Sequence, residues 1–311
     1  MKHRTTKAVI ISLLTCVIWG FSFLFTRSIV IRIHFLSLLS WRFLIATLAF
    51  LLLIRLKVFK INLKGKKLRP LIYISIAEPI IFFTCESIGL YLTSTTESSL
   101  MIATIPIVTM LIGIPIAGEM PTKKQAVAII LSVVGVVVII LGQSRRLGFN
   151  ILGYIVLLIA VISGSVFAAL SAKYSEYTSV EKSFAMVVIG LIGFGGGALA
   201  YNLLRGTVRE WLLLPFQDRE FLIAILYLGL LASIICYVGQ QYSLSIIGLN
   251  RNTSFSGVIT LTSVLAGIFI LDEKLSLSML VGGIIVVLGV YGANYYTPQR
   301  EHDKAKCPQD E

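Results

Sequence analysis

Of the 311 residues in the chain, 57% are hydrophobic and only 14% are charged. A typical soluble domain is about half apolar and a quarter charged, so this composition excludes an ordinary soluble protein. The formal net charge of +12 does not indicate a nucleic-acid partner, because the basic residues cluster beside apolar segments, where they report topology. The four cysteines show no paired spacing, so we expect neither a disulfide framework nor a metal site.

Apolar residues are gathered into ten runs of roughly 18–24 residues, each close to the ~20 residues with which a helix crosses a bilayer. The connections between these runs are mostly short and polar. The sequence therefore predicts an all-α integral membrane protein with ten transmembrane helices. The predicted helices cover residues 8–28, 34–54, 70–90, 97–117, 124–142, 151–172, 183–204, 221–246, 252–271 and 277–296.

The distribution of Lys and Arg predicts how the chain lies in the membrane. Basic residues are concentrated in the N-terminal segment MKHRTTK and in the loop 55–69, and such residues favour the cytoplasmic side. The first run lacks a small-residue cleavage site, so we expect a retained helix rather than a signal peptide. Both termini are then cytoplasmic, residues 297–311 form a short disordered tail, and the basic loop contacts anionic membrane lipids. We expect a multi-pass protein of the cell (cytoplasmic or inner) membrane.

Two stretches of the sequence match each other at an offset of 154 residues: GEMPTKKQAVAIILSVVGVVVII at 118–140 and DEKLSLSMLVGGIIVVLGVYGA at 272–293. In this alignment Gly135 lies on Gly289. Because the second copy lies five predicted helices further along the chain, the second half enters the membrane from the opposite side, which makes a 5+5 inverted-topology repeat. Such repeats place a substrate site near the midplane between the halves. The two repeats are expected over residues 1–146 and 147–296.

Several features of the chain together resemble the EamA-type family of the drug/metabolite transporter superfamily. They are ten spans, a doubled unit, the dipeptide of Trp19 and Gly20 in the first span, and an acidic residue, Glu119 or Glu273, that precedes a glycine-containing helix. The resemblance covers nearly the whole chain. Pro106 matches a proline that is usual in the fourth span of this family, whereas Thr260 stands at the corresponding position of the second half.

The resemblance implies a secondary transporter that moves a small organic solute by alternating access at a midplane cavity. It suggests an amino acid or a related metabolite as the solute, and export as the direction. We expect no cofactor, because the sequence contains no nucleotide-binding loop, and no enzymatic activity, because it contains no His–Glu–x–x–His pair and no Ser/His/Asp set. The alternative is a membrane-embedded sensor, scaffold or enzyme without transport activity.

Three ionisable residues lie inside predicted spans. Inserting a charged side chain at the centre of a membrane helix costs roughly 2.5–3.5 kcal/mol, so each is expected to have a structural or functional role. They are Arg42, Glu78 and Glu86. At ~1.5 Å per residue, each glutamate lies about 6 Å from Arg42 in membrane depth, so either can pair with it. The functional interpretation makes a glutamate a proton carrier or a contact for a cationic part of the substrate. The structural interpretation makes it only the counter-ion of Arg42. Pro79 frees a backbone carbonyl beside Glu78, which favours Glu78 as the functional one.

Polar residues of the eighth predicted span are further candidates for the substrate site. Tyr237 and Gln241 lie one helical turn apart, with Gln240 beside them, and Gln240 falls on Glu86 at the offset of 154. Amides in membrane helices also serve simply as interhelical hydrogen-bond partners. Weaker candidates for the pocket wall are Trp19, Ser98, Ser99, Ser163, Ser165, Asn252 and Ser256. Trp19 lies too deep for an interface anchor and is expected to stack on a ligand.

Glycine-rich stretches inside the spans are read as helix-packing positions and not as phosphate-binding loops. The spacing of Gly193 and Gly197 fits close helix contact, and LVGGIIVVLGVYG at 280–292 fits a helix pair or the surface of a homodimer. The expected partners are therefore a small-molecule substrate, protons as a candidate coupling ion, membrane lipids and, as one option, a second copy of the chain.

Overall fold

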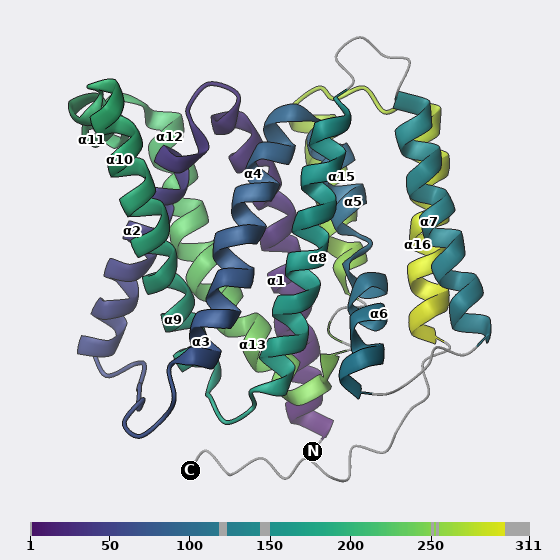
Figure 1. Cartoon of the computed structure of the whole chain (residues 1–311), viewed down its shortest axis with the longest axis horizontal. Coiled ribbons are helices and arrows are strands. Elements are labelled where there is room, and N and C mark those ends of the chain that lie inside the picture. Colours follow the sequence, from purple (N-terminus) through teal and green to yellow (C-terminus); the bar gives the residue numbers. More distant parts are fainter. Residues whose placement is uncertain (1, 118–122, 144–149, 250–251, 253–254, 296–311) are drawn as a thin grey trace.

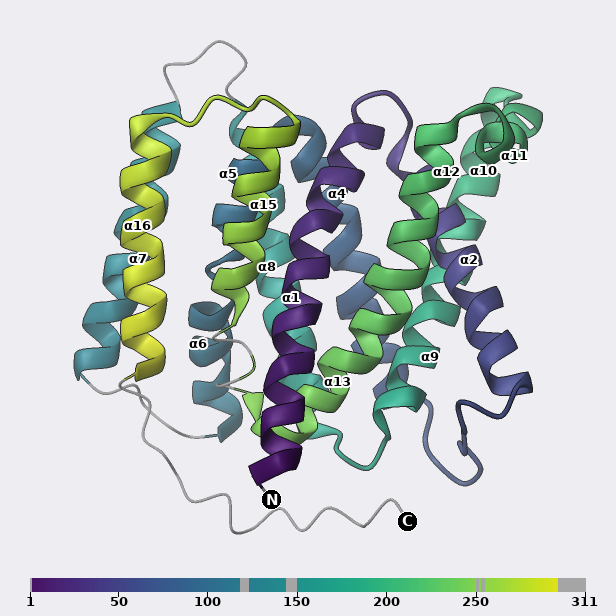
Figure 2. The same cartoon turned by 180° about the vertical axis from the view of Figure 1, so that it is seen from behind.

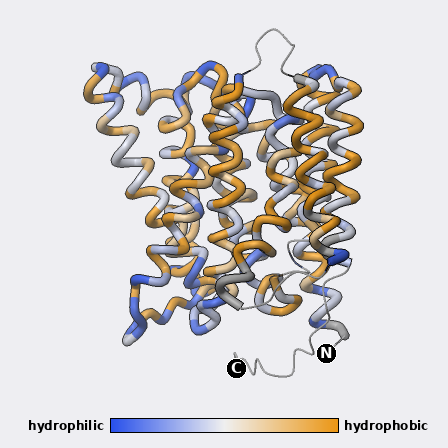
Figure 3. The backbone as a smooth tube through the Cα atoms, turned by 45° about the vertical axis from the view of Figure 1, so that its right-hand side comes forward, coloured by the Kyte–Doolittle hydropathy of each residue, from blue (hydrophilic) through white to orange (hydrophobic). Residues whose placement is uncertain are grey.

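In the computed structural model, residues 2–117, 123–143, 150–249, 252 and 255–295 are described, and within them all regular structure is helical (Figure 1). Seven helices or helix series are long and apolar enough to cross a membrane: Arg4–Val30, Phe35–Arg55, Arg69–Leu92, Thr95–Ile112, Ile151–Lys173, Ser179–Arg205 and Arg219–Ile247. Three further apolar helices are shorter: Ala126–Gly142, Ser256–Ile270 and Leu277–Gly292. Hydrophobic residues cover the middle of the helices, and hydrophilic residues gather at the two ends of the molecule (Figure 3).

The elements of the first part of the chain are α1 (Lys2–Val30), α2 (Phe35–Arg55), α3 (Arg69–Ser75), the π-helical segment η1 (Ile76–Ile81), α4 (Phe82–Leu92), α5 (Thr95–Ile102), α6 (Ile105–Ala117) and α7 (Lys123–Gln143). Those of the second part are α8 (Ile151–Lys173), α9 (Ser179–Gly190), the π-helical segment η2 (Leu191–Gly195), α10 (Gly196–Arg205), α11 (Val208–Gln217), α12 (Arg219–Leu226), the π-helical segment η3 (Tyr227–Ile235), α13 (Cys236–Ile247), α15 (Ser256–Ile270) and α16 (Leu277–Tyr295). Viewed from behind, α1 crosses the centre of the molecule beside α13 and α15 (Figure 2).

Two features of the helix order differ from the sequence prediction. The run 97–117 was predicted as one helix, but it is divided into α5 and α6 at Ala103 and Thr104. Between α10 and α12 the prediction had only a loop, and the structure has the ten-residue helix α11 there. Glu119 and the tail 297–311 lie outside the described residues.

Helices α7 and α16, which carry the two matching stretches, pack chiefly against each other at one side of the molecule (Figure 1). A Cβ atom on Gly135 would lie 2.7 Å from the carbonyl oxygen of Gly282, and one on Gly289 would lie 2.7 Å from that of Ala128. Gly282 follows Ala128 by 154 positions, just as Gly289 follows Gly135, so the two contacts are reciprocal. Ser132 Oγ also donates to the carbonyl of Val286, 154 positions further on, at 3.0 Å. The glycines of 280–292 therefore form a helix pair within the chain.

A large aromatic core holds the remaining helices together. The ring of Phe43 on α2 stacks on Phe194 of η2 at 5.5 Å between centroids, and Phe83 of α4 packs 6.1 Å from Phe43. Gly190 gives the room for these contacts, since a Cβ at this position would lie 2.6 Å from the Phe43 ring. Gly193 and Gly197 face Ile80 and Leu36 of neighbouring elements, so the helix-packing interpretation of this glycine stretch is confirmed.

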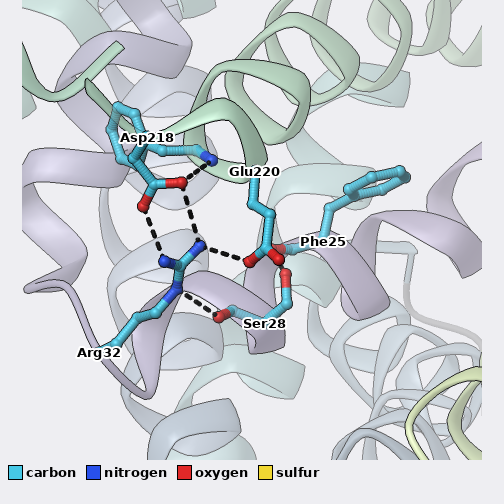
Figure 4. A network of polar contacts seen from close by, with 6 residues as sticks. Phe25, Ser28, Arg32, Asp218 and Glu220 are labelled. Carbon is cyan, nitrogen blue, oxygen red and sulfur yellow. Dashed lines mark hydrogen bonds and ion pairs between the residues drawn. The ribbon is translucent and has the colours of Figure 1, made fainter. Parts of the chain in front are cut away.

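Charged groups tie the helices together at both ends of the molecule. At the end that carries the α1–α2 connection, Arg32 donates to Asp218 at 2.7 Å and to Glu220 at 2.8 Å, and Asp218 also caps the N-terminus of α12 (Figure 4). At the other end, Lys66 joins the basic loop between α2 and α3 to helix α9, because its amine lies 2.7 Å from the carboxylate of Glu181. This second end, which also carries the start of α1, is called the basic end below.

Candidate functional site

The third candidate span is interrupted where Pro79 prevents regular hydrogen bonding. Proline has no N–H to donate, and the residue before it is Glu78, whose backbone is extended (φ −140°, ψ 121°) inside η1. The Glu78–Pro79 peptide bond is cis. The carbonyl of Ala77 accepts a hydrogen bond of 2.7 Å from Ser163 Oγ of α8. The interruption that the sequence predicted is thus present, and a serine from the second half of the chain satisfies its carbonyl.

The break between α5 and α6 is supported from the same helix. Ser165 Oγ of α8 donates to the carbonyl of Ile105 at 3.2 Å, next to Pro106. The other end of α5 is fixed by Glu273, whose carboxylate accepts from the backbone N–H groups of Thr95 at 2.7 Å and Thr96 at 2.9 Å. A carboxylate at a helix N-terminus satisfies free N–H groups and the helix dipole together. Helix α5 is therefore held by residues from the second half of the chain.

The second half of the chain contains a milder irregularity, the π-helical segment η3 (Tyr227–Ile235), which has no kink like that at Glu78. Its carbonyl at Ala232 accepts from the indole nitrogen of Trp19 at 3.0 Å, and Tyr227 donates to the carbonyl of Ile18 at 2.9 Å. Both contacts are made with α1, from the first half. Helix α8 of the second half thus donates to a carbonyl of η1, and helix α1 of the first half donates to a carbonyl of η3. A membrane interior requires such partners, because it offers no water to the backbone.

Between these interruptions lies a cavity of about 90 Å³, several times the roughly 10–15 Å³ that a single water molecule needs. Its walls come from α1, η1, α4, α5 and α6 of the first half and from α8, α13 and α15 of the second. The described residues that line it are Cys16, Trp19, Ser22, Phe23, Glu78, Phe82, Phe83, Glu86, Ile102, Ile105, Gly164, Phe167, Ala168, Gln240, Asn252, Ser256 and Ile259.

Two carboxyl groups open onto the cavity. Glu78 is 6% exposed and Glu86 is 3% exposed. In the part of the chain that the structure describes, neither carboxyl group has an ion-pair partner within 4.0 Å or a hydrogen-bond partner. Both residues line the cavity, so the carboxyl groups border its free space.

Arg42 is not the direct ion-pair partner that the sequence suggested for either glutamate. Its Nε donates to Ser233 Oγ of η3 at 2.9 Å, and its guanidinium carbon lies 4.1 Å from the centre of the Phe83 ring. Phe83 lines the cavity and Arg42 does not, so the ring is interposed between the cation and the cavity. The similar membrane depths of Arg42 and the two glutamates were compatible with an ion pair. Their side chains leave the helices in directions that keep them apart.

The other predicted site residues divide into two groups. Trp19, Gln240, Asn252 and Ser256 line the cavity with the two glutamates, and Asn252 also accepts from Ser12 at 2.9 Å. Tyr237, Gln241 and Ser99 do not line it. Gln241 instead donates to Ser171 at 3.1 Å, and Ser99 returns its hydroxyl to its own helix at Thr96. Tyr237 packs its ring 6.4 Å from Phe83, within the aromatic core.

Sequence reasoning missed most of the aromatic wall of the cavity, which is formed by Phe23, Phe82, Phe83 and Phe167. Phe23 follows Trp19 by four positions and so lies on the same face of α1, which is a signal that could have found it. The other three look like ordinary apolar residues of a membrane helix. Among the described residues, no group of three His, Cys, Asp or Glu side chains is placed to hold a metal ion.

The chain resembles known proteins along almost all of its length. The model of the EamA-like transporter family matches it twice, over residues 6–141 and 151–295. It is 30% identical to a protein of Bacillus subtilis (strain 168) named "Uncharacterized transporter YcxC", over 94% of this chain and 95% of that one. It is 25% identical to an "Uncharacterized transporter" of Archaeoglobus fulgidus, over 92% of this chain and 98% of the other.

A solved crystal structure has the same fold, with a TM-score of 0.63 at 15% sequence identity, and it covers 92% of this chain and 97% of its own. That likeness speaks for the fold alone. The double family match and the relative in Bacillus subtilis go further and agree with the apolar helices of the structure. The chain belongs to the EamA-like transporter family, and it is a multi-pass helical membrane protein.

Proposed function

We propose that the protein is a secondary transporter, which carries a small organic solute across the membrane by alternating access. The observation that carries this proposal is the cavity between the two halves, which Glu78 and Glu86 line without an ion-pair or hydrogen-bond partner among the described residues. Ionisable groups inside a membrane protein are costly and mark substrate or proton pathways. A purely structural pair of acids would be expected to have its counter-ion in direct contact.

The proposal includes a 5+5 inverted repeat, with domains over residues 1–146 and 147–296. Three observations support it: the double family match, the reciprocal contacts of Gly135 and Gly289, and the antiparallel run of α7 against α16. In such a repeat the halves rock around a central site. The walls of the cavity come from both halves, which suits this movement.

The solute class proposed from the family resemblance is an amino acid or a related metabolite, with export as the direction. The basic end faces the cytoplasm in this proposal, because its loop carries Lys60, Lys64, Lys66 and Lys67. Transport is coupled to protons through Glu78 or Glu86, and it needs neither a cofactor nor an enzymatic step. The membrane is the cell (cytoplasmic or inner) membrane, and the two halves within one chain complete the site without a second copy.

The test is uptake into proteoliposomes of a panel of labelled amino acids and small metabolites, with and without an imposed pH gradient. Saturable uptake that responds to the gradient is expected for the wild-type protein. Glu78→Gln and Glu86→Gln are expected to weaken the response to the gradient at least tenfold. Glu210→Gln is the matched control, because Glu210 is exposed on α11, away from the cavity.

The outcomes separate the parts of the proposal. Saturable uptake that does not depend on the pH gradient would indicate a transporter without proton coupling. Both glutamates would then have a structural role. No uptake of any solute by protein that is shown to be folded would overturn the transporter proposal in favour of a membrane-embedded sensor, scaffold or enzyme.

A further inference from the structure

The charge of the cavity wall points to one class of solute. We propose that the cavity selects monovalent organic cations, amines with an apolar body and no carboxylate, over zwitterionic amino acids and over anions. This inference rests on the proposed transport function and narrows its substrate class.

The charged groups that a bound solute meets in the described wall of the cavity are acidic. Among the described residues that line the cavity, the strongly ionisable ones are Glu78 and Glu86, and none is Lys, Arg or His. An ammonium group finds two carboxyl groups there that no other described residue pairs with. The carboxylate of a zwitterion finds like charges and no cation, which is how a site rejects a competitor.

Aromatic side chains form part of the remaining wall. Phe23, Phe82, Phe83 and Phe167 line the cavity together with Trp19. Aromatic rings attract cations through their negative faces and also pack against apolar groups. The indole N–H of Trp19 is already donated to Ala232, so toward a solute this residue offers its ring system and no hydrogen bond. Such a wall suits an amine with an apolar body.

The charges of Glu78, Glu86 and Arg42, which are all buried, do not balance one another when both acids are ionised. Two ionised glutamates and the guanidinium of Arg42 sum to one net negative charge. One proton or one monovalent cation brings this sum to zero, which the low-dielectric interior favours. A cation that enters therefore competes with a proton, and the displaced proton leaves to the solvent.

The other charged and titratable groups near the pair, among the residues that the structure describes, leave this balance unchanged. Helix α1 contributes the thiol of Cys16, and α13 contributes Cys236 and Tyr237, all buried and uncharged when protonated. The described lining residues of α5, α6, α8 and α15 have no ionisable side chain. On α9, the ionisable residues are engaged at the basic end: Glu181 by Lys66 and Lys182 by the carbonyl of Ser171.

The experiment uses two sets of labelled probes, each of which keeps one apolar body and changes the charged groups attached to it. The first set is isobutylamine, valine and isovalerate, and the second is 2-phenylethylamine, phenylalanine and 3-phenylpropionate. Uptake into proteoliposomes is measured for each, together with the proton release that follows addition to the purified protein in weak buffer. We expect the amine of at least one set to be taken up, and to exceed its zwitterion and its anion at least tenfold.

Two further readouts sharpen the result. Amine binding is expected to tighten as the pH is raised, by up to about tenfold per pH unit, because the amine and one proton compete for the same site. Glu78→Gln and Glu86→Gln are each expected to weaken amine binding at least tenfold, while Glu210→Gln leaves it unchanged. If a glutamate variant does not fold, the proton release of the wild-type protein, about one proton for each amine bound and none with valine, decides alone.

Uptake of valine or phenylalanine in preference to the amine of the same set would overturn the cation inference and leave the transporter proposal standing. So would amine uptake without any proton release across the pH range. If none of the six probes is taken up while another solute of the metabolite panel is, the inference fails and the transport function does not. If the folded protein transports nothing, both proposals fail together.

Discussion

Two of the three described π-helical segments, η1 and η3, occupy corresponding positions in the two halves and differ in backbone and in chemistry, since η1 has a kink at Glu78. Shifted by 154 positions, η1 falls on residues 230–235, within η3. In each segment a carbonyl accepts a hydrogen bond from a side chain of the other half, from Ser163 in η1 and from Trp19 in η3. The same shift places Glu78 on Ala232 and Glu86 on Gln240. Both halves supply an irregular helix, and one half alone supplies the acids.

The two halves share irregular helices and differ in the side chains that these helices carry toward the cavity. Such an irregularity needs only a proline or locally loosened hydrogen bonding together with a partner for the freed carbonyl, so two different sequences can both meet it. A pair of charges in a membrane interior costs free energy at each position, so repeating it in both halves would double the cost. The asymmetry also gives the cavity one acidic wall, and hence a direction in which a solute can be oriented.

The largest effect is expected from Arg42 of α2, which is the cation nearest the acids among the described residues and donates to Ser233 of η3. Arg42→Met should destabilise the protein by about 3–5 kcal/mol, because it leaves buried acids without a nearby positive charge. The measurement is unfolding in detergent micelles. Arg55→Met, at the exposed end of the same helix, is the control and should change little.

The double variant Arg42→Met with Glu86→Gln should recover part of the loss, since one acid is then neutral. A double variant no more stable than Arg42→Met alone would show that Arg42 and Glu86 are not coupled.

A smaller effect is expected at the contact of α7 and α16, and it tests whether the two halves share one backbone plan. Gly135→Val and Gly289→Val should each cost about 1–3 kcal/mol, because the added atoms meet the backbone of the facing helix. The two losses should be similar, since the contacts are reciprocal. Gly196→Val, where a Cβ meets nothing within 4 Å, is the control for valine itself. Clearly unequal losses at the two glycines would contradict the reciprocity.

The hydrogen bonds to η1 and η3 should contribute less. Ser163→Ala is expected to destabilise the protein by about 0.6 kcal/mol, the average for a side-chain hydrogen bond between membrane helices, and by at most about 1.7 kcal/mol. Ser28→Ala is the control, because Ser28 returns its hydroxyl to its own helix at Phe25. Equal stability of the two variants would mean that the carbonyl of Ala77 does not depend on Ser163.

The smallest effect is expected at the half-exposed network of Arg32, Asp218 and Glu220, which joins the two halves outside the cavity (Figure 4). Partial burial of Asp218 acts to raise the pKa of its carboxyl, but the N–H of Phe221 and the charge of Arg32 outweigh it and hold that pKa below its ordinary value of 3.8. A lowered pKa stabilises the folded state above the unfolded pKa, and this contribution is lost as the pH falls through the folded value.

The stability of the wild-type protein should therefore fall more steeply than that of Asp218→Asn as the pH drops below about 4. Added salt should reduce the difference between the two proteins at neutral pH, because exposed ion pairs are screened. The thermal midpoint in detergent at several pH values measures both effects. Parallel pH profiles would show that the network does not form in solution.

The helices and one interruption could be predicted from the sequence, because their causes are local. Apolar runs of membrane length and the proline beside Glu78 both act on the nearest residues. The division of α5 from α6 was missed, although Pro106 stands beside it, because apolar composition alone does not reveal a change of direction. By contrast α15, with Thr260 at the corresponding position, runs without a break from Ser256 to Ile270.

The composition of the site was harder to predict, because it depends on helical phase. Gln240 lines the cavity and Gln241 does not, and neighbouring positions on a helix differ by about 100°. In a soluble helix a polar face would settle that angle, but this span is apolar on nearly all sides. The surroundings of Arg42 could not be predicted either, because a ring 41 positions further along the chain, Phe83, comes between it and the cavity.

The contact of α7 and α16 has a consequence for how the protein assembles. A contact in which one patch meets a copy of itself is the hallmark of a two-fold interface between identical subunits. Here Gly135 meets Gly282, and Gly289 meets Ala128, so one polypeptide encloses an interface of the kind that a half-length ancestor would have formed as a homodimer. Within one polypeptide that association is permanent and independent of concentration. The glycine faces of α7 and α16 are thus occupied within the chain and are not open to a second copy.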